Sequence, residues 1–93
     1  MIYTNHAKKR IANRALPIEV LESIFYLGKE FSSNGGARII KLADRLAKSE
    51  FTEELKRKGL KIRKKWFNAY LVCDGSGVVL TAGYRNKRIF ANY

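Results

Sequence analysis

The feature that most constrains the fold is a turn sequence near the carboxyl end of the chain, Asp74-Gly75-Ser76-Gly77, with an apolar-rich run on each side. Asp and Gly in such a cluster favour a tight reversal of the backbone. Apolar-rich runs that bracket a cluster of this kind favour two antiparallel strands. The sequence therefore predicts a hairpin that pairs residues 66–73 with residues 78–85.

Counting outward from a loop of four residues gives the register of this hairpin, with Cys73 opposite Val78 and Trp66 opposite Arg85. The core face is then expected to carry the following residues: Phe67, Ala69, Leu71, Cys73, Val78, Leu80, Ala82 and Tyr84. The other face is expected to carry Trp66, Asn68, Tyr70, Val72, Val79, Thr81, Gly83 and Arg85. A slip of one residue would exchange the two faces, so the assignment depends on the loop length.

Helical patterns occupy the first third of the chain. Thr4-Asn5 can cap a helix over residues 6–15, and Pro17 ends it because Pro disfavours helical geometry in the residue before it. A second helix is predicted over residues 17–27, with Pro17 in its first turn and Gly28 as its stop. Its buried stripe consists of residues at helical spacing: Ile18, Leu21, Ile24 and Phe25.

The middle of the chain predicts a turn over residues 32–36, a short strand over 37–42 and a third helix over 43–58. Ser49 can also cap a new turn ahead of Glu53, which leaves two shorter helices as the alternative. The fold class expected is α+β, with N-terminal helices packed on a small antiparallel sheet that ends in a C-terminal hairpin. A chain of 93 residues makes one domain, residues 1–93.

The chain is strongly basic, with 19 Lys and Arg against 8 Asp and Glu and a net charge of +11. Seven of the basic residues fall within residues 56–65, directly ahead of Trp66, Phe67 and Tyr70. Positive charge for phosphates beside flat side chains for bases is typical of a nucleic-acid-binding surface. The alternative is a solubilising surface, or one that meets an acidic protein. Hydrophobic residues make up 46% of the chain, which is enough for a core and excludes a disordered basic tail.

The outer face of the predicted hairpin is the first candidate site. Trp66, Tyr70 and Arg85 there would stack on unpaired bases, while neighbouring cations bind the phosphates. The full set of nucleic-acid-binding residues predicted is Arg14, Arg38, Arg63, Lys64, Lys65, Trp66, Tyr70, Lys87 and Arg88. A structural role for Trp66, packed beneath a helix, is the alternative.

The first helix carries the second candidate site. His6, Arg10 and Arg14 recur every four residues and so line one side of that helix. Arg binds phosphate with two parallel hydrogen bonds, and His transfers protons near neutral pH. The combination suits phosphoryl chemistry, although the same spacing also describes solvated side chains on an exposed helix.

Other chemistries find little support in the sequence. One His, one Cys and no tight acidic cluster offer no set of metal ligands, so neither a metal nor another cofactor is expected. Cys73 falls on the expected core face as a small buried hydrophobe, and a lone Cys fits a reducing cytoplasm. The longest uncharged apolar-rich run, residues 66–73, is too short to cross a bilayer, and no secretory signal is expected. The sequence therefore predicts a cytoplasmic protein without a membrane partner.

The segment His6-Ala7-Lys8-Lys9-Arg10-Ile11-Ala12-Asn13-Arg14-Ala15-Leu16 resembles the opening of a group of small bacterial and phage proteins. That group begins His-Ala-x-x-Arg-(apolar)-x-x-Arg-x-(apolar), and Val79-Leu80-Thr81 is similar to an element of its last strand. The group looks like the BrnT branch of the RelE/ParE-type toxin superfamily. The specific match covers residues 6–16, and the match to the last hairpin is looser. The helix at 43–58 departs from the shorter family plan and looks like an insertion.

The resemblance implies a metal-independent ribonuclease of a toxin–antitoxin system, or a partner of an acidic antitoxin. It places the opening motif on His6, Arg10 and Arg14, and the terminal-strand Thr on Thr81. Without a metal, the ribose 2′-OH attacks its own phosphate, which needs a proton acceptor, a stabilised anion and a proton donor. The catalytic residues expected are His6 as acid or base, Arg10 and Arg85 on the phosphate, with Arg14 beside them, and Tyr84 or Lys65 as a further donor.

Three functions stay open on the sequence alone. The first is a ribonuclease toxin that acts on RNA, on or off the ribosome, and is neutralised by an acidic antitoxin. The second is a basic nucleic-acid-binding protein without catalysis, whose affinity depends on salt. The third is a protein-interaction module that binds an acidic partner. We rank them in that order.

Overall fold

The computed structural model describes residues 1–85, with Asn34 described by its backbone alone. The helices are α1 (Asn5–Asn13), α2 (Ile18–Leu27) and α3 (Arg45–Arg57). The strands are β1 (Lys29–Ser32), β2 (Arg38–Lys41), β3 (Ala69–Cys73) and β4 (Val79–Tyr84), and two 3₁₀ turns are η1 (Asn34–Gly36) and η2 (Lys64–Asn68). The predicted α+β class is confirmed. No helix within residues 1–85 is long and apolar enough to cross a membrane.

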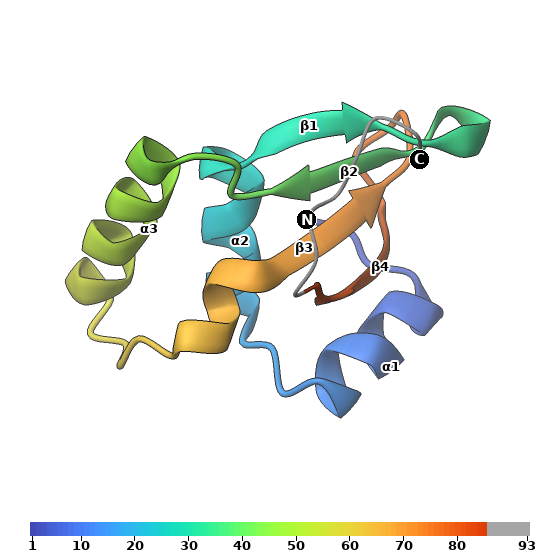
Figure 1. Cartoon of the computed structure of the whole chain (residues 1–93). Helices are drawn as coiled ribbons and strands as arrows, with labels where there is room; N and C mark the ends of the chain where they lie inside the picture. Colours follow the sequence, from blue (N-terminus) through green and yellow to red (C-terminus); the bar gives the residue numbers. More distant parts are fainter. Residues whose placement is uncertain (86–93) are drawn as a thin grey trace.

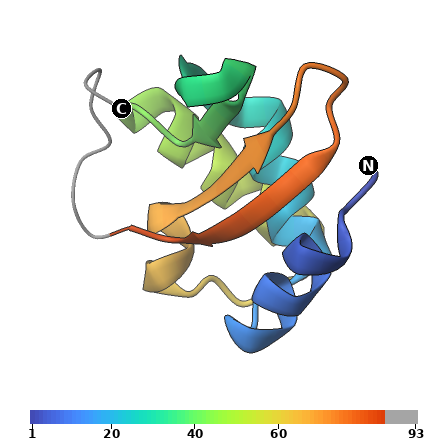
Figure 2. The ribbon, with the colours of Figure 1, turned by 90° about the vertical axis from the view of Figure 1, so that its right-hand side faces the viewer.

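The strands form one antiparallel sheet in the order β1-β2-β3-β4, so β4 lies at an edge (Figure 1). The segment before α1 partly covers that edge, because Tyr3 forms a parallel bridge with Val79. Helix α1 packs against β4, α2 against β2 and β3, and α3 against α2. Figure 2 shows α2 and α3 behind the sheet and α1 beside β4. The helices therefore cover one face of the sheet, which we call the core face.

The core fills the space between this face and the helices. Its fully buried members come from helices and strands alike and include Leu21, Ile24, Phe51, Leu55 and Leu71. Phe51 of α3 meets Phe67 of η2 edge to face, with ring centroids 5.6 Å apart. The helix expected at 43–58 thus contributes two large side chains, Phe51 and Leu55, to the core.

The helices agree closely with the sequence expectation. The Thr4 hydroxyl accepts a hydrogen bond from the Ala7 N–H and caps α1, and Gly28 ends α2. Asp44 caps α3, which continues without a break through Ser49 to Arg57. The alternative of two shorter helices is therefore wrong.

Strand β1 was not expected from the sequence. Only Phe31 among its residues is partly buried, so it lacks the alternation that marks a half-buried strand. It forms because Gly28 lets the chain reverse tightly after α2. A Cβ at Gly28 would lie 2.5 Å from the Ile24 carbonyl oxygen and 2.9 Å from that of Lys41. β1 then pairs along the whole of β2.

The hairpin forms with a different register from the one predicted. The Asp74 N–H donates to the Val78 carbonyl, and the Asp74 carboxylate accepts from the N–H groups of Ser76 and Val78. This leaves a loop of residues 75–77, with Gly77 at φ +86°, the left-handed position that such loops require. The prediction of a four-residue loop is therefore wrong. The Asp74 side chain accepts hydrogen bonds from within the turn and stabilises a loop of residues 75–77.

A bulge then shifts the register again. Cys73 lies opposite Val79, but Val72 lies opposite Thr81, so Leu80 is the extra residue of β4. The β3 half of the predicted core face is confirmed, since Ala69, Leu71 and Cys73 are buried. In β4 the prediction placed Leu80 on the core face, and the bulge places Val79 there instead.

Candidate nucleic-acid interface

The face of the sheet away from the helices, which we call the open face, brings together residues from all four strands. Lys29 lies opposite Lys41, Lys41 opposite Tyr70, and Tyr70 opposite Gly83. Because directly paired residues project from the same side of a sheet, these positions form one row across it. Arg85, two residues beyond Gly83, projects from the same side.

Tyr70 lies flat along this row. A Cβ at Gly83 would lie 3.1 Å from the Tyr70 hydroxyl oxygen and 3.3 Å from a ring carbon, so the outer part of the ring rests on the Gly83 backbone. The Arg85 guanidinium carbon is 5.8 Å from the ring centroid, within the range of a cation–π contact. The structure thus joins Tyr70 and Arg85, two of the predicted site residues.

The predicted role of Trp66 as a base-stacking side chain is wrong. Trp66 belongs to η2, ahead of β3, and only 4% of its surface is exposed. Its indole packs in the core, so no base can reach the ring. The sequence run from Trp66 to Cys73 looks like one continuous strand, but its first part turns inward because Lys64 to Asn68 form the 3₁₀ turn η2.

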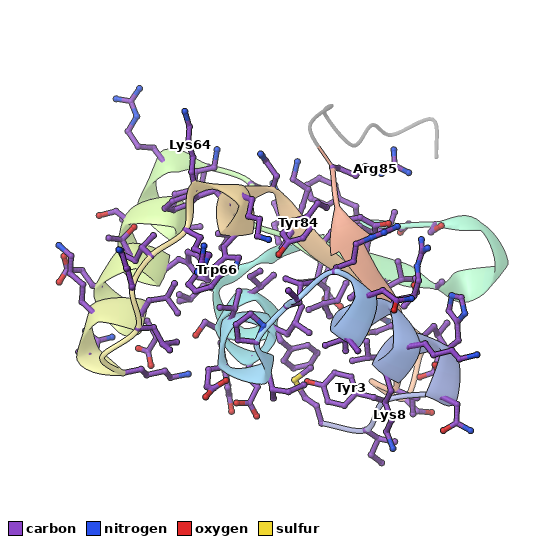
Figure 3. The ribbon with its side chains drawn as sticks, turned by 90° about the horizontal axis from the view of Figure 1, so that it is seen from below. Tyr3, Lys8, Lys64, Trp66, Tyr84 and Arg85 are labelled. Atoms are coloured by element: carbon purple, nitrogen blue, oxygen red, sulfur yellow. The ribbon has the colours of Figure 1, made fainter. Side chains whose placement is uncertain are left out.

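Tyr84 and Arg85, predicted to act together, project from opposite faces of the sheet. Tyr84 lies opposite Ala69 and belongs to the core face, whereas Arg85 belongs to the open face. The Lys65 amino group lies over the Tyr84 ring, 5.4 Å from its centroid. Burial raises the pKa of the Tyr84 hydroxyl, and the nearby Trp66 indole N–H and Arg63 charge oppose that rise in part. Figure 3 shows Tyr84 between Trp66 and Arg85.

Helix α1 is fixed to the beginning of β4. The Thr4 N–H donates to the Val79 carbonyl at 3.0 Å, and the Thr4 hydroxyl donates to the Leu80 carbonyl at 3.0 Å. His6 is exposed in the first turn of α1 and so stands over this end of the strand. Tyr84 lies four residues further along β4, about 13 Å away at the usual rise of an extended strand. The predicted catalytic residues His6 and Tyr84 are therefore associated with opposite ends of β4.

Four buried polar atoms within residues 1–85 have no hydrogen-bond partner there, and all lie on β4 or on elements packed against it. Two belong to β4 itself, the Thr81 and Tyr84 hydroxyls. The others are Arg10 Nε of α1 and Trp66 Nε1 of η2. The Trp66 N–H and the Tyr84 hydroxyl are close enough to interact with each other, which leaves Arg10 Nε and the Thr81 hydroxyl as the two that need another explanation.

Positive charge surrounds the same strand. Residues 5–14 and 61–65 contain no acidic residue, and we name their cations, apart from Lys8, the basic surface: Lys9, Arg10, Arg14, Lys61, Arg63, Lys64 and Lys65. Figures 1 and 2 both show α1 and η2 at the lower end of the molecule. Figure 3 shows Lys64 and Arg85 reaching toward one side of it, whereas Lys8 lies with Tyr3 along an apolar groove of about 480 Å³.

The ion pairs found among residues 1–85 lie away from the basic surface. Arg57 pairs with Glu54 on α3, and Arg38 pairs with Glu30 at 3.3 Å across β1 and β2. Arg38, a predicted phosphate contact, therefore has an acidic partner and is separated from the basic surface by β3 and β4. Five of the eight acidic residues lie on α2 and α3. Lys87 and Arg88, also predicted as phosphate contacts, fall outside the described residues.

The sequence reasoning missed Lys29 and Lys41 as candidate site residues. Their partnership with Tyr70 depends on the pairing of β1 with β2 and of β2 with β3, which no local pattern reveals. Within residues 1–85, no group of three or more His, Cys, Asp or Glu side chains is placed to hold a metal ion. Comparison with protein-family models, with curated proteins and with solved structures gives no match.

Proposed function

We propose that this protein binds RNA through the basic surface. The observation that carries the proposal is the unopposed positive charge of α1 and residues 61–65, which lie on elements at one end of the molecule around β4. Exposed Lys and Arg side chains without acidic partners bind phosphates by releasing the counterions condensed on the nucleic acid. The cytoplasmic setting expected from the sequence places RNA within reach.

The binding measurement that tests this is a salt titration with purified protein and RNA. For a single strand, the logarithm of the binding constant falls against the logarithm of salt concentration with a slope of about −0.7 for each phosphate neutralised. Engagement of most of the basic surface predicts a slope of about −3 to −5 on that relation. Affinity that does not change with salt would contradict the proposal.

A second candidate function, metal-independent cleavage of the bound RNA, is favoured by Tyr84. Its buried hydroxyl lies beside the Lys65 amino group and the Trp66 indole N–H. Like any phenol, the hydroxyl keeps its proton at neutral pH and so can donate to the leaving oxygen. In this proposal Arg10 contacts the phosphate and His6 accepts a proton. Since a strand within a sheet does not shorten, His6 and Tyr84 would have to reach the phosphate from opposite ends of β4, about 13 Å apart.

Cleavage is tested by incubation with RNA in excess EDTA, followed by analysis of the product ends. The proposal predicts 2′,3′-cyclic phosphate ends that are lost in His6→Ala and Tyr84→Phe. Unchanged cleavage in both variants would contradict the assigned roles. If the protein binds RNA but does not cleave it, with or without ribosomes, the proposed binding function stands and the proposed catalytic function is wrong. As part of the same toxin-like proposal, an acidic antitoxin would compete with RNA for the basic surface.

A further inference from the structure

The row across the open face combines an aromatic side chain with cations, whereas the basic surface consists of cations alone. Lys29, Lys41, Tyr70 and Gly83 follow one another strand by strand, with Arg85 next to Tyr70. We propose that this row binds single-stranded RNA, with one base stacked at Tyr70 and the adjoining phosphates on Lys41 and Lys29. The inference rests on the proposed RNA binding and adds which form of RNA is bound and where.

The geometry of Tyr70 suits stacking. Its ring rests on Gly83, where the missing side chain allows the close approach. Arg85 approaches the ring at 5.8 Å from its centroid. A base can enter this stack beside the ring, with the planar guanidinium either above the base or on its phosphate. Tyr70 is partly exposed, unlike Trp66, so its ring is accessible from solvent.

The spacing of the row matches a polynucleotide that crosses the strands. Neighbouring strands lie about 4.8 Å apart, so Lys41 and Lys29 follow Tyr70 at about 5 and 10 Å. Both lysine side chains reach phosphates on one side of a base at Tyr70. No acidic residue of the four strands projects from the open face, since Glu30 pairs with Ile40 on the core face.

Stacking at Tyr70 requires an unpaired base. In an A-form duplex the ring faces are covered by neighbouring bases, and proteins contact the backbone and the shallow groove instead. The row therefore distinguishes single strands from duplexes, whereas the basic surface binds the phosphates of both. Next to the row, Phe31 and Val72 are partly exposed on the same face, on either side of the buried Ile39.

The test compares two probes and two variants. The probes are a 2′-O-methyl oligoadenylate of about 12 nucleotides, a length within the usual single-strand site sizes, and the corresponding 2′-O-methyl duplex. Neither can be cleaved by 2′-OH attack. Tyr70→Leu removes the aromatic ring, and Tyr70→Phe keeps it as the matched control. We expect Tyr70→Leu to bind the single strand about 5- to 150-fold more weakly, the usual loss for one stacked base, and to bind the duplex unchanged.

If Tyr70→Leu and wild type bind the single strand equally tightly, the inference is overturned. The proposed RNA binding still stands in that case, because the wild-type protein binds RNA. Wild-type protein that binds neither probe would overturn both. Photo-cross-linking of wild-type protein to the oligoadenylate carrying 8-azidoadenosine needs no variant and so does not depend on the folding of Tyr70→Leu. Attachment to the peptide that contains Tyr70 supports the inference, and attachment confined to α1 overturns it.

Discussion

Trp66 and Lys64 show how two nearby residues in one basic and aromatic stretch serve different purposes. The Trp66 indole packs in the core, while the Lys64 side chain extends into solvent. Composition alone does not separate them, because an aromatic residue after a run of cations fits a binding surface and a core equally well. The burial of Trp66 follows from the 3₁₀ turn, which long-range packing against α3 stabilises.

Replacement of Trp66 by Ala is therefore expected to act on stability. We expect Trp66→Ala to lower the free energy of unfolding by about 3–5 kcal/mol, the usual cost of removing a large buried aromatic side chain. Lys64→Ala should change it by less than about 0.5 kcal/mol. Urea denaturation measures both. A loss below about 1 kcal/mol for Trp66→Ala would show that the indole is not packed as described.

Cys73 predicts how stability responds to alkaline pH. Burial, with smaller contributions from Asp74 and Glu30, raises the pKa of this thiol above its ordinary value of 9.0. The unfolded thiol then ionises first, so its contribution to stability is complete below pH of about 8.5 and is lost as pH rises through the folded pKa.

In the variant Cys73→Ala this part of the pH dependence should disappear. The difference in unfolding free energy between wild type and variant should be constant at neutral pH and change above pH of about 9, under reducing conditions. Burial also raises the pKa values of Tyr3 and Tyr84, and the Cys73 charge contributes to the rise at Tyr3, so both proteins carry Tyr3→Phe in this comparison. A difference that stays constant up to pH of about 11 would contradict the assigned burial.

At the scale of elements, two contacts determine where α1 and β1 lie. Thr4 joins α1 to β4, because its hydroxyl accepts from Ala7 N–H and donates to the Leu80 carbonyl. Gly28 permits β1 to follow α2 without a loop. The first contact places the cations of α1 beside β4, and the second places Lys29 in the row on the open face.

Thr4→Val keeps the shape of the side chain and removes both hydrogen bonds of the hydroxyl. A loss of about 1–3 kcal/mol of stability is expected from the missing cap and the unpaired backbone groups. Thr4→Ser keeps both bonds and should lose less than about 1 kcal/mol. Thermal unfolding followed by circular dichroism gives the comparison. Equal losses in the two variants would mean that the methyl group, rather than the hydroxyl, is what matters.

Gly28→Ala tests the turn between α2 and β1. The added Cβ would lie within 3.0 Å of two backbone carbonyl oxygens and the Ile40 side chain, so the backbone has to move. We expect a loss of about 1–3 kcal/mol or more, as in other overpacked sites. Gly75→Ala is the matched control, since a Cβ there has no atom within 4 Å. If Gly28→Ala were as stable as Gly75→Ala, the tight turn would be wrong.

At the scale of the whole molecule, the sequence predicts the helices and the α+β class well because their signals are local. Thr4, Pro17 and Gly28 mark the helix ends. Apolar spacing identifies only part of the buried side of α2, since Leu21 and Ile24 are buried but Ile18 is exposed. Register and site geometry depend on contacts between distant residues. The carboxylate of Asp74 shortens the hairpin loop, and the Leu80 bulge shifts β4 again. The row at Tyr70 exists only once β1 and β2 pair, so the sequence identifies Tyr70 and Arg85 but not Lys29 or Lys41.

The charge of the whole molecule is unevenly distributed. Cations without acidic neighbours occupy α1 and residues 61–65, whereas α2 and α3 hold most of the carboxylates. A general electrostatic attraction would depend on net charge alone, and a specific surface depends on where the charge lies. Two double variants with the same net charge separate these cases.

The most direct measurement compares RNA affinity in Lys64→Glu/Lys65→Glu, on the basic surface, and in Lys48→Glu/Lys56→Glu, on the exposed side of α3. Both variants change the net charge by the same amount. We predict that the first pair weakens binding about tenfold or more and makes the salt slope shallower by about 1.4, the value for two phosphate contacts at 0.7 each, while the second leaves both nearly unchanged. Equal weakening by the two pairs would contradict a localised RNA-binding surface.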